Sequence, residues 1–541
     1  MRMSFRLSIF SLRMAPLMGC ACATLSIILL SRGHLVGAGL IAFILFFLLT
    51  ILGVYDLWQS EHSILRNYPT LGHLRFLLED IRPEIRQYFL EDETQGYPFS
   101  RNKRAVIYQR AKNNLDKRPF GTQLDVYDEG FEWLSHSISP LTVGSHDFRI
   151  TIGGPHCRQP YNASLFNISA MSFGALSANA LLALNAGAKN GGFAHNTGEG
   201  GISPYHQTHG GDLIWEIGSG YFGCRAHDGQ FDPGAFAHHA RDDQVKMIEI
   251  KLSQGAKPGH GGILPAAKVS REIASIRGVQ MGEDCVSPAA HSAFSTPIEL
   301  LQFVQKLRDL SAGKPVGFKL CIGRPSEFLA ICKAMLETGI LPDFVTVDGK
   351  EGGTGSAPLE FMDHIGMPMR EGLALVHHAL IGAGVREHIR IGVSGKIATG
   401  FDIARASALG ADWCYSARGF MFALGCIQSL KCHTDRCPTG VATQDPTRAR
   451  ALDPSLKAER VRNYHRATMT ALSELTAAAG VEHPRDLQAR NFYWRASENQ
   501  IVTLDQLYPR PVSGAFLDGQ IDDRLAHAWR EARADSFRPI S

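Results

Sequence analysis

The chain has almost no net charge, and its cysteines are too few for a disulfide scaffold. Its 55 lysines and arginines nearly balance 52 aspartates and glutamates, which gives a formal charge of +3. This balance excludes a globally basic nucleic-acid binder, so we expect no nucleic-acid partner. The 11 cysteines among 541 residues are sparse and uneven, which is typical of an intracellular chain with one thiolate site.

Charge is also missing from two apolar runs near the N-terminus. The first covers Ala15–Leu30, and the second, Leu35–Tyr55, has no charged residue in 21 positions. A helix of that length spans the roughly 30 Å hydrocarbon core of a bilayer. We therefore expect a hairpin of two transmembrane helices joined by Ser31–His34. A single span with an interfacial first segment and a cleaved signal peptide are the alternatives.

The arginines before the first apolar run predict the orientation of this anchor. Arg2, Arg6 and Arg13 lie there, and positively charged flanks stay in the cytoplasm. A hairpin returns the chain to the same side. We therefore expect an inner-membrane protein, in contact with membrane lipid, whose catalytic domain is cytoplasmic. A single span would place that domain outside, in conflict with the thiolate site.

After about residue 148, short β-branched runs alternate with helical stretches, and no internal repeat is present. The expected strands are Asn167–Phe173, Met247–Leu252, Val316–Leu320, Asp343–Asp348, Ile389–Ser394 and Asp412–Ala417. The expected helices are Ser326–Gly339, Gly372–Ala383 and Phe401–Leu409. This alternation predicts an α/β fold of the (β/α)8 TIM-barrel class. A doubly wound sheet is the alternative, weakened because no GxGxxG follows any expected strand.

We divide the chain into four segments. Residues 1–60 form the membrane anchor, and residues 61–147 form a helical extension packed against the main domain. Residues 148–480 form the barrel. Residues 481–541 form a polar, helix-prone extension that also packs against the barrel.

Three glycine-containing loops follow expected strands. Gly349–Gly355 follows one strand directly, and Ser394–Lys396 and Ala417–Gly419 follow the last two. Bare glycines let backbone N–H groups surround an anion, and the last loops of a barrel usually hold phosphate. The loops predict a phosphorylated cofactor, and FMN fits because no separate dinucleotide domain is visible.

Two lysines interrupt expected strands, Lys251 in EIKL and Lys319 in GFKL. A buried lysine needs a partner. Each lysine therefore either forms a salt bridge inside the barrel or places its positive charge beside the electron-rich edge of a reduced flavin. Two further loops, Asn196–Gly201 and Gln254–Gly259, place one carboxylate and one amine among glycines. These loops are either part of a rim site or tight turns with solvated charges.

Cys426, Cys432 and Cys437 cluster after the last expected strand. Three thiolates suit a metal centre. No CxxC pair is present for a zinc ribbon, and no fourth cysteine lies nearby for a four-cysteine cluster. A three-iron cluster needs only three ligands; zinc and free thiols are the alternatives.

Several long, ordered stretches resemble one known family. They are MSFGALS (Met171–Ser177), the Asn196–Gly201 loop, EIKLSQGAKPGHGG (Glu249–Gly262), GGTGSAP (Gly352–Pro358) and CHTDRCPTGVATQ (Cys432–Gln444). Together they resemble the FMN- and iron–sulfur-binding synthase domain of glutamate synthase, over roughly residues 167–444. The whole chain, including ILRNYP and IRPEIRQYF, resembles the stand-alone, membrane-anchored glutamate synthase-like proteins of bacteria.

The resemblance implies a (β/α)8 barrel that binds FMN and a 3Fe–4S cluster, the latter on Cys426, Cys432 and Cys437. In the family, 2-oxoglutarate and ammonia give 2-iminoglutarate, and reduced FMN transfers a hydride to its imine carbon, giving L-glutamate. Electrons enter through the iron–sulfur cluster.

Site residues are carried over by motif. Gln254, Lys257 and Arg277 match residues that bind the 2-oxo acid. Glu199 matches the loop glutamate that couples ammonia arrival to the synthase site, so Lys257 and Glu199 are the catalytic candidates. Lys319 matches the flavin-contacting lysine. The other cofactor-binding candidates are Met171, Ser172, Gly352, Gly353, Thr354, Gly355, Ser394, Gly395, Arg418 and Gly419.

The sequence also departs from the family. The glutamine amidotransferase domain and the pyridine-nucleotide subunit have no counterpart, so we expect a separate ammonia source. Electrons would come from a protein such as ferredoxin or from a membrane redox partner. Ser287–Ala293 reads SPAAHSA where the family has SPPPHHD, and Lys350–Glu351 replaces His-Asp. The first change puts the identity of the substrate in doubt.

We therefore predict a glutamate synthase-like flavoprotein that reductively aminates 2-oxoglutarate or a related 2-oxo acid. One alternative is a transferase-type synthase that joins an amine to a 2-oxo acid, as in N-methylglutamate formation. Another is a membrane flavin and iron–sulfur electron-transfer module, which would need no dicarboxylate site.

Overall fold

The computed structural model describes residues 12–31, 37–521 and 523–538, and it divides the chain into two units, Met1–Asp92 and Glu93–Ser541. Arg2, Arg6 and the turn residues Arg32–His34 lie outside the described residues. The four segment boundaries drawn from the sequence stay predictions.

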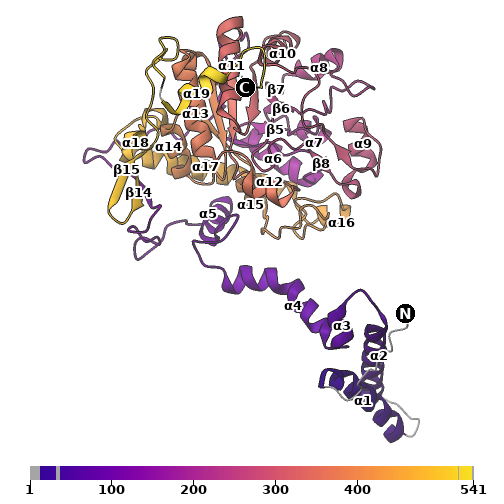
Figure 1. Ribbon diagram of the computed structural model, residues 1–541. Coiled ribbons are helices and arrows are strands. Elements are labelled where there is room, and N and C mark those ends of the chain that lie inside the picture. Colours follow the sequence, from indigo (N-terminus) through magenta and orange to yellow (C-terminus); the bar gives the residue numbers. More distant parts are fainter. Residues whose placement is uncertain (1–11, 32–36, 522, 539–541) are drawn as a thin grey trace. The chain divides into compact units, whose positions relative to one another are not determined.

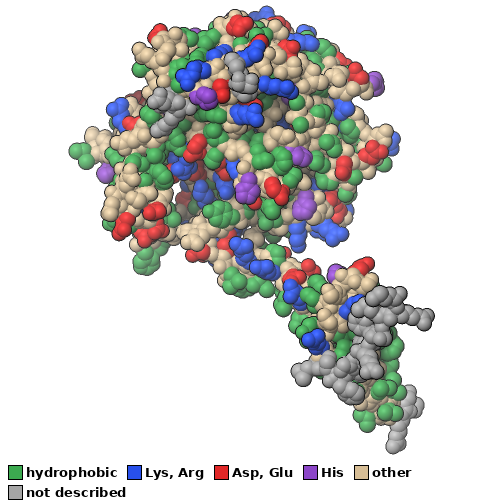
Figure 2. Space-filling model, viewed as in Figure 1, with side chains coloured by type: hydrophobic (Ala, Val, Ile, Leu, Met, Phe, Trp, Pro, Cys, Tyr) green, Lys and Arg blue, Asp and Glu red, His purple; other side chains and the backbone are tan. Residues whose placement is uncertain are grey.

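Two apolar helices begin the first unit. After a 3-10 turn at Leu12–Met14, α1 covers Ala15–Ser31 and α2 covers Ala38–Trp58. The helices pack side by side, with the hydroxyls of Thr24 and Thr50 3.5 Å apart. Of the helices in the described ranges, only α2 is long and apolar enough to cross a membrane; α1 is apolar but shorter. Hydrophobic side chains lie at the surface of this unit (Figure 2).

A buried carboxylate holds the chain that follows α2. Asp56 accepts a hydrogen bond from the backbone N–H of Thr70 (2.8 Å) and pairs with Nε2 of His73 (2.8 Å). The start of the next long helix is thereby held at the end of α2. The helices of this region are α3 (Ser63–Asn67), α4 (Gly72–Ile85) and a π-helical turn at Arg86–Leu90.

Eight parallel strands close into a barrel in the second unit (Figure 1). In order around the barrel they are β4 (Phe166–Ile168), β5 (His195–Asn196), β6 (Leu213–Ile217), β7 (Val245–Lys251), β10 (Val316–Leu320), β11 (Phe344–Asp348), β12 (Arg390–Ser394) and β13 (Trp413–Ser416). β13 pairs with β4, for example Tyr415 with Asn167, so the sheet has no edge. This closure confirms the (β/α)8 prediction and excludes the doubly wound sheet, which stays open.

Helices surround the barrel strands (Figure 1). The longer ones are α6 (Ala178–Gly191), α8 (Pro233–Ala240), α10 (Pro297–Leu310), α11 (Pro325–Thr338), α13 (Met369–Gly382), α14 (Gly400–Ala408) and α17 (Pro454–Ala478). Shorter ones are α7 (Pro204–Gln207), α9 (Arg271–Arg277), α12 (Leu359–His364), α15 (Arg418–Leu424) and α16 (Pro446–Ala449). α13 begins three residues before the expected Gly372, because the N–H of Met369 donates to the Glu351 carboxylate (2.9 Å).

The strand expected over Asn167–Phe173 is wrong in its extent. β4 ends at Ile168, and its neighbour β5 has only two residues, so the hydrogen-bonded ladder stops there. From Ser169 onward the chain leaves the sheet and forms a loop at the carboxyl end of the barrel.

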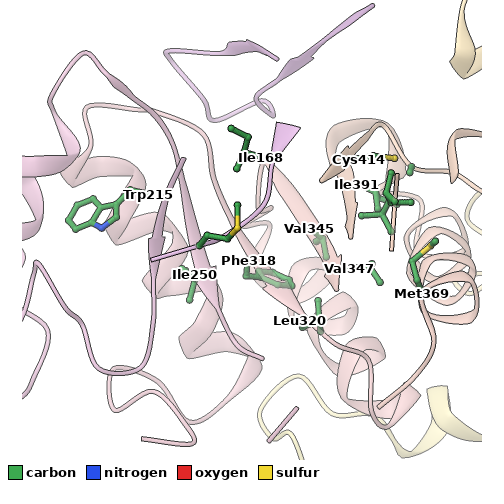
Figure 3. Close-up of a cluster of buried hydrophobic side chains, with 14 of the residues drawn as sticks. Ile168, Trp215, Ile250, Phe318, Leu320, Val345, Val347, Met369, Ile391 and Cys414 are labelled. Carbon is green, nitrogen blue, oxygen red and sulfur yellow. The ribbon is translucent and has the colours of Figure 1, made fainter. Parts of the chain in front are cut away.

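Side-chain alternation along the strands divides the core into two parts. Phe318, Leu320 and Val345 belong to the outer cluster, between the strands and the helices (Figure 3). A second cluster fills the barrel interior and includes Ile152, Tyr161, Ile214, Met247, Phe344, Trp413 and Tyr415. The first two belong to the hairpin of β2 (Arg149–Ile152) and β3 (Tyr161–Ser164). Lys319, which lies between Phe318 and Leu320, therefore faces the interior.

The segments before and after the barrel are joined in one small sheet. β1 (Glu132–Leu134) pairs antiparallel with β14 (Phe492–Ser497), which pairs with β15 (Gln500–Thr503). Glu132 also forms ion pairs with Arg370 and Arg405. The sequence predicted only helices here, because strands that pair across more than 350 residues have no local signal. The helices of these segments are α5 (Arg101–Ala111), α18 (Leu504–Leu507) and α19 (Asp523–Glu531).

Candidate active site

A cavity of about 570 Å³ lies at the carboxyl ends of the barrel strands. Every barrel strand contributes to its wall, either directly or through the loop that follows. The contributing residues include, in barrel order, Met171, Glu199, Glu216, Lys251, Lys319, Asp348, Ser394 and Ser416. This is the end of a (β/α)8 barrel where loops hold ligands.

One part of the cavity is built from the glycine-containing loops. Gly352, Gly353, Thr354, Gly355, Ser394, Gly395 and Arg418 all line it. Asp348 joins two of the surrounding loops, because it accepts hydrogen bonds from the Ser394 hydroxyl and from the N–H of Gly255 (2.7 Å to the latter). Gly419 does not line the cavity; its missing side chain leaves room for Ser416 and Tyr464.

Two cations stand at this part of the cavity. Burial lowers the pKa of Arg418 to about 10, against the opposing effect of Asp348 and Glu351, and burial also lowers the pKa of Lys396. At a pKa of about 10, Arg418 carries a positive charge at neutral pH. Bare backbone beside two cations fits the phosphate of FMN.

Two aromatic residues before α5 complete this wall. Tyr97 and Phe99 line the cavity, and their rings lie 5.3 Å from the Lys396 ammonium and 4.9 Å from the Arg418 guanidinium. Phe99 also exchanges backbone hydrogen bonds with the amide of Gln428. From the sequence we predict no site role for this stretch, because only the fold brings it to the barrel.

Replacing Tyr97 with alanine should weaken FMN binding about two- to fivefold. The substitution removes the cation–π contact with Lys396, and such contacts contribute about 0.5–1 kcal/mol. Titration of the apoprotein with FMN, followed by flavin fluorescence, measures this change. Tyr127→Ala is the matched control, because its exposed ring lies under Arg495 and outside the cavity lining. Equal FMN affinity in the two variants would contradict the assignment.

Below the glycine loops, Lys319 lies in a buried charged network. Its ammonium pairs with Glu216 and lies 3.8 Å from Glu249, which also accepts hydrogen bonds from Asn196 (2.8 Å) and Thr346 (2.7 Å). Burial alone would lower the pKa of Lys319, but the two carboxylates raise it. Burial raises the pKa of Glu249, and Lys319 opposes this.

The two interpretations of Lys319 are therefore compatible in this fold. Its side chain forms a salt bridge inside the barrel, and it also lines the cavity. A lysine that stays charged here can face a ligand while two carboxylates compensate its burial.

The other part of the cavity is rich in cations. Lys251, Lys257, Lys268 and Arg277 line it with Glu199 and Gln254. Burial alone would raise the pKa of Glu199, but Lys251, Arg277 and Lys257 lower it to about 2. Glu199 is therefore ionised, and its Oε1 lies 2.7 Å from Nζ of Lys251. Four basic side chains face one carboxylate here. Burial lowers the pKa of Lys257 and of Lys268, and Asp435 opposes this at Lys268; the surplus of basic groups fits an anionic ligand.

Arg277 comes to the cavity from α9. Its guanidinium donates to the carbonyl of Phe173 (3.0 Å). The Cζ atom of the same guanidinium lies 5.2 Å from the centre of the Phe222 ring. Among the described residues, its buried Nε has no hydrogen-bond partner. A buried donor without a partner is costly, and a carboxylate of a bound ligand would satisfy it.

The Ser287–Ala293 segment differs from the family at four positions, and it lines this part of the cavity at one unchanged residue. Ser287 lines the cavity, and its hydroxyl lies 3.5 Å from Glu199. His291 instead pairs with the carbonyl of Lys251 (2.9 Å) and the hydroxyl of Tyr221 (3.2 Å) outside the lining. Of these two positions, Ser287 touches the ligand space and His291 supports the strand that carries Lys251.

Three buried histidines predict loss of stability in mild acid. Burial lowers the pKa of His206 to about 3, of His291 to about 4 and of His465 to about 3. Below pH 6.5 the unfolded chain takes up protons that the folded chain does not. Each histidine therefore lowers the free energy of unfolding by about 2 kcal/mol between pH 7.5 and pH 5.

Urea unfolding of the full chain at these two pH values tests this expectation. His206→Gln should make the urea midpoint less dependent on pH. His527 is exposed, so His527→Gln should leave that dependence unchanged. A urea midpoint that stays constant from pH 7.5 to pH 5 would show that these histidines titrate normally.

The three clustered cysteines lie beside the cavity. Cys426 and Cys432 line it, and Cys437 is buried behind them. Burial raises the pKa of Cys426, and the other two thiols raise it further. In the described parts of the chain, no three or more Cys, His, Asp or Glu side chains are arranged to hold a metal ion.

The surroundings of Cys437 suit a thiolate, whereas burial raises the pKa of Cys432, as it does that of Cys426. Burial would raise the pKa of Cys437, but hydrogen bonds from Thr439, Val441 and Ala442 lower it. The buried ammonium of Lys268 donates to the Ala442 carbonyl (3.1 Å) and interacts with the charges of Cys432 and Cys437. Hydrogen-bonded sulfur beside a cation is the chemistry that an anionic cluster requires.

Fold and cavity together define a (β/α)8-barrel protein with a cavity lined by basic side chains at the carboxyl ends of its strands. The family model for the conserved region in glutamate synthase matches residues 151–482. The chain belongs to the glutamate synthase family.

Two relatives illustrate this membership. The chain is 39% identical over 503 residues to the glutamate synthase large subunit-like protein YerD of Bacillus subtilis, covering 85% of this chain and 95% of that protein. It is 37% identical over 326 residues to the archaeal glutamate synthase [NADPH] of Methanocaldococcus jannaschii. That match covers 59% of this chain and 60% of the archaeal protein. A solved flavocytochrome b2 variant with sulfite bound aligns at a TM-score of 0.42 and 12% identity, over 84% of this chain and 91% of that one.

Proposed function

We propose that this chain is a glutamate synthase-like oxidoreductase that reductively aminates 2-oxoglutarate, or a related 2-oxo acid, to L-glutamate with FMN. One observation carries the proposal: a single cavity joins the glycine loops to a group of four cations. The first part fits a phosphorylated cofactor and the second fits a dicarboxylate. An electron-transfer module would need no such group of cations.

FMN, when bound, supplies the hydride. Gly352–Gly355, Ser394 and Arg418 would hold its phosphate, and Lys319 would face it from the barrel floor with its charge balanced by Glu216. Met171 and Ser172 line the same cavity from the loop after β4.

Around the 2-oxo acid, Arg277, Lys257 and Gln254 would bind the carboxylates and orient the oxo group. Glu199 is ionised, so it accepts hydrogen bonds and does not deliver a proton. Its role in the proposed reaction is to accept a hydrogen bond from the incoming ammonia while Lys251 holds its position. Holding ammonia beside the oxo carbon favours their condensation to the imine, which releases one water molecule.

Electrons would enter through a 3Fe–4S cluster held by Cys426, Cys432 and Cys437. The hydrogen bonds to Cys437 and the buried Lys268 support this donor set. The electron donor would be a protein such as ferredoxin or a membrane redox partner, and ammonia would come from a separate source.

We also propose that the first unit anchors the protein in the inner membrane, with the catalytic barrel in the cytoplasm. The apolar length of α2 supports one span, and the packing of α1 against α2 supports a hairpin. Membrane lipid is then a permanent partner of the chain.

Anaerobic flavin reoxidation tests the proposed reaction. The purified chain is reduced chemically, and FMN absorbance is followed after addition of 2-oxoglutarate with and without ammonia. We expect prompt reoxidation only when both are present, with glutamate as the product. Reoxidation with methylamine but not with ammonia would indicate the N-methylglutamate-type reaction instead. A chain that binds flavin but responds to neither amine would contradict both.

A further inference from the structure

An apolar stripe runs along one face of α4. Leu74, Leu77, Leu78, Ile81 and Ile85 recur at the i, i+3, i+4 and i+7 spacing of a single helix face. All five side chains are exposed, with 36% to 56% of their surface accessible. The π-helical turn that follows adds exposed Tyr88, Phe89 and Leu90. So long an apolar face is not stable in water and requires a partner.

The position of α4 indicates which partner this is. The exposed aromatic residues Tyr55 and Trp58 end α2, and such residues concentrate where a membrane meets water. Between them, Asp56 binds the Thr70 backbone and His73 at the start of α4. The apolar stripe therefore begins at the level where a span formed by α2 would leave the hydrocarbon core.

The charges of α4 fit the same surroundings. Arg75 and Arg82 of α4 and Arg86 of the turn after it lie beside the apolar stripe, and Arg75 pairs with Glu79 one turn later (2.8 Å). Asp80 and Glu84 are the other charged residues of α4. Arginines that flank an apolar face are typical of helices that lie among lipid headgroups, where they meet phosphates. A helix meant for a protein core carries fewer cations along the edge of its apolar face.

We propose that α4 and the turn after it lie in the headgroup region of the bilayer that α2 crosses, with the apolar stripe toward the acyl chains. The proposal rests on the membrane anchor proposed above and adds a second, parallel contact with lipid. The chain leaving the span is thereby held along the membrane surface for the length of α4. About 5–10 Å of burial below the headgroups is the usual depth of such a helix.

The experiment places one environment-sensitive fluorescent amino acid in the full-length chain, at one of three positions. Leu48 in α2 reports on the anchor, Leu78 on the apolar stripe and Glu79 on the opposite edge of α4. All three side chains are exposed, and the Glu79 substitution removes only a surface ion pair with Arg75. The protein is reconstituted into vesicles of phosphatidylcholine and phosphatidylglycerol, whose acyl chains carry bromine either near the headgroup or near the chain end.

We expect the Leu78 probe to be quenched several-fold more by bromine near the headgroup than the Glu79 probe. The Leu48 probe should be quenched most by bromine near the chain end. Equal, weak quenching at Leu78 and Glu79 with strong quenching at Leu48 would overturn the interfacial helix and leave the anchor in place. A blue-shifted but unquenched Leu78 probe would show that protein covers the stripe, which also overturns it. No quenching at Leu48 would overturn the anchor and this inference together.

Discussion

Replacing Arg277 with alanine should raise the KM for 2-oxoglutarate about 30-fold or more, while kcat changes much less. Arg277 is 5% exposed, and its Nε has no partner in the described part of the chain. Loss of one side of a buried, hydrogen-bonded charge pair costs about 2–5 kcal/mol. Because the carboxylate is bound equally before and during hydride transfer, the loss falls on binding.

The Arg277 prediction is measured by steady-state assays and by flavin reoxidation at varied 2-oxoglutarate. Arg277→Lys keeps the charge but not the two-pronged geometry, so it should fall between alanine and the native residue. Arg271→Ala is the matched control, since it removes an exposed arginine from the first turn of the same helix. An unchanged KM in Arg277→Ala would contradict the assignment of the dicarboxylate to this part of the cavity.

Replacing Cys437 with serine should abolish the iron–sulfur cluster, with iron falling from about three atoms per chain to near zero. Cys437 is the cysteine of the three whose surroundings lower its pKa, through hydrogen bonds that a cluster sulfur would also accept. Serine keeps the size of the side chain but is a far weaker iron ligand, because soft thiolates select iron–sulfur clusters.

Iron analysis and electron paramagnetic resonance of anaerobically purified protein measure this loss. Cys157→Ser is the control, because Cys157 lies outside the cavity lining, where its thiol donates to the Gly313 carbonyl (3.4 Å). Cluster content should be unaffected in that variant, and FMN content should persist in both. Zinc in place of iron, or equal iron in both variants, would contradict the cluster.

The residues of the site were predictable to the extent that they lie in short continuous motifs. Gln254, Lys257, Glu199 and Arg277 resembled family motifs, and the fold brings all four to one cavity. Gly419 shows the limit of this reasoning, because its motif neighbour Arg418 lines the cavity while Gly419 serves helix packing. The sequence does not distinguish a glycine that leaves room for a ligand from one that leaves room for neighbouring side chains.

Other residues of the cavity had no local signal. Glu216 lies in the buried strand LIWEI, and nothing in that strand indicates that its carboxylate meets Lys319 more than a hundred residues later. Lys268 appears as an ordinary lysine in a loop, yet it is buried beside the cysteine loop. Tyr97 and Phe99 reach the cavity wall beside Lys396 and Arg418 only because the chain before the barrel folds onto the barrel.

The barrel, the apolar helix α2 and the chemical types of the site were predictable from local rules. Those rules are the strand and helix periods, the length of an apolar run, and glycines, lysines and cysteines at fixed short spacings. The fold alone shows which charges compensate one another, that the cation group and the glycine loops share one cavity, and that the apolar stripe of α4 begins at the end of α2. These depend on distances between residues far apart in the chain, and burial in the fold gives such contacts most of their energy.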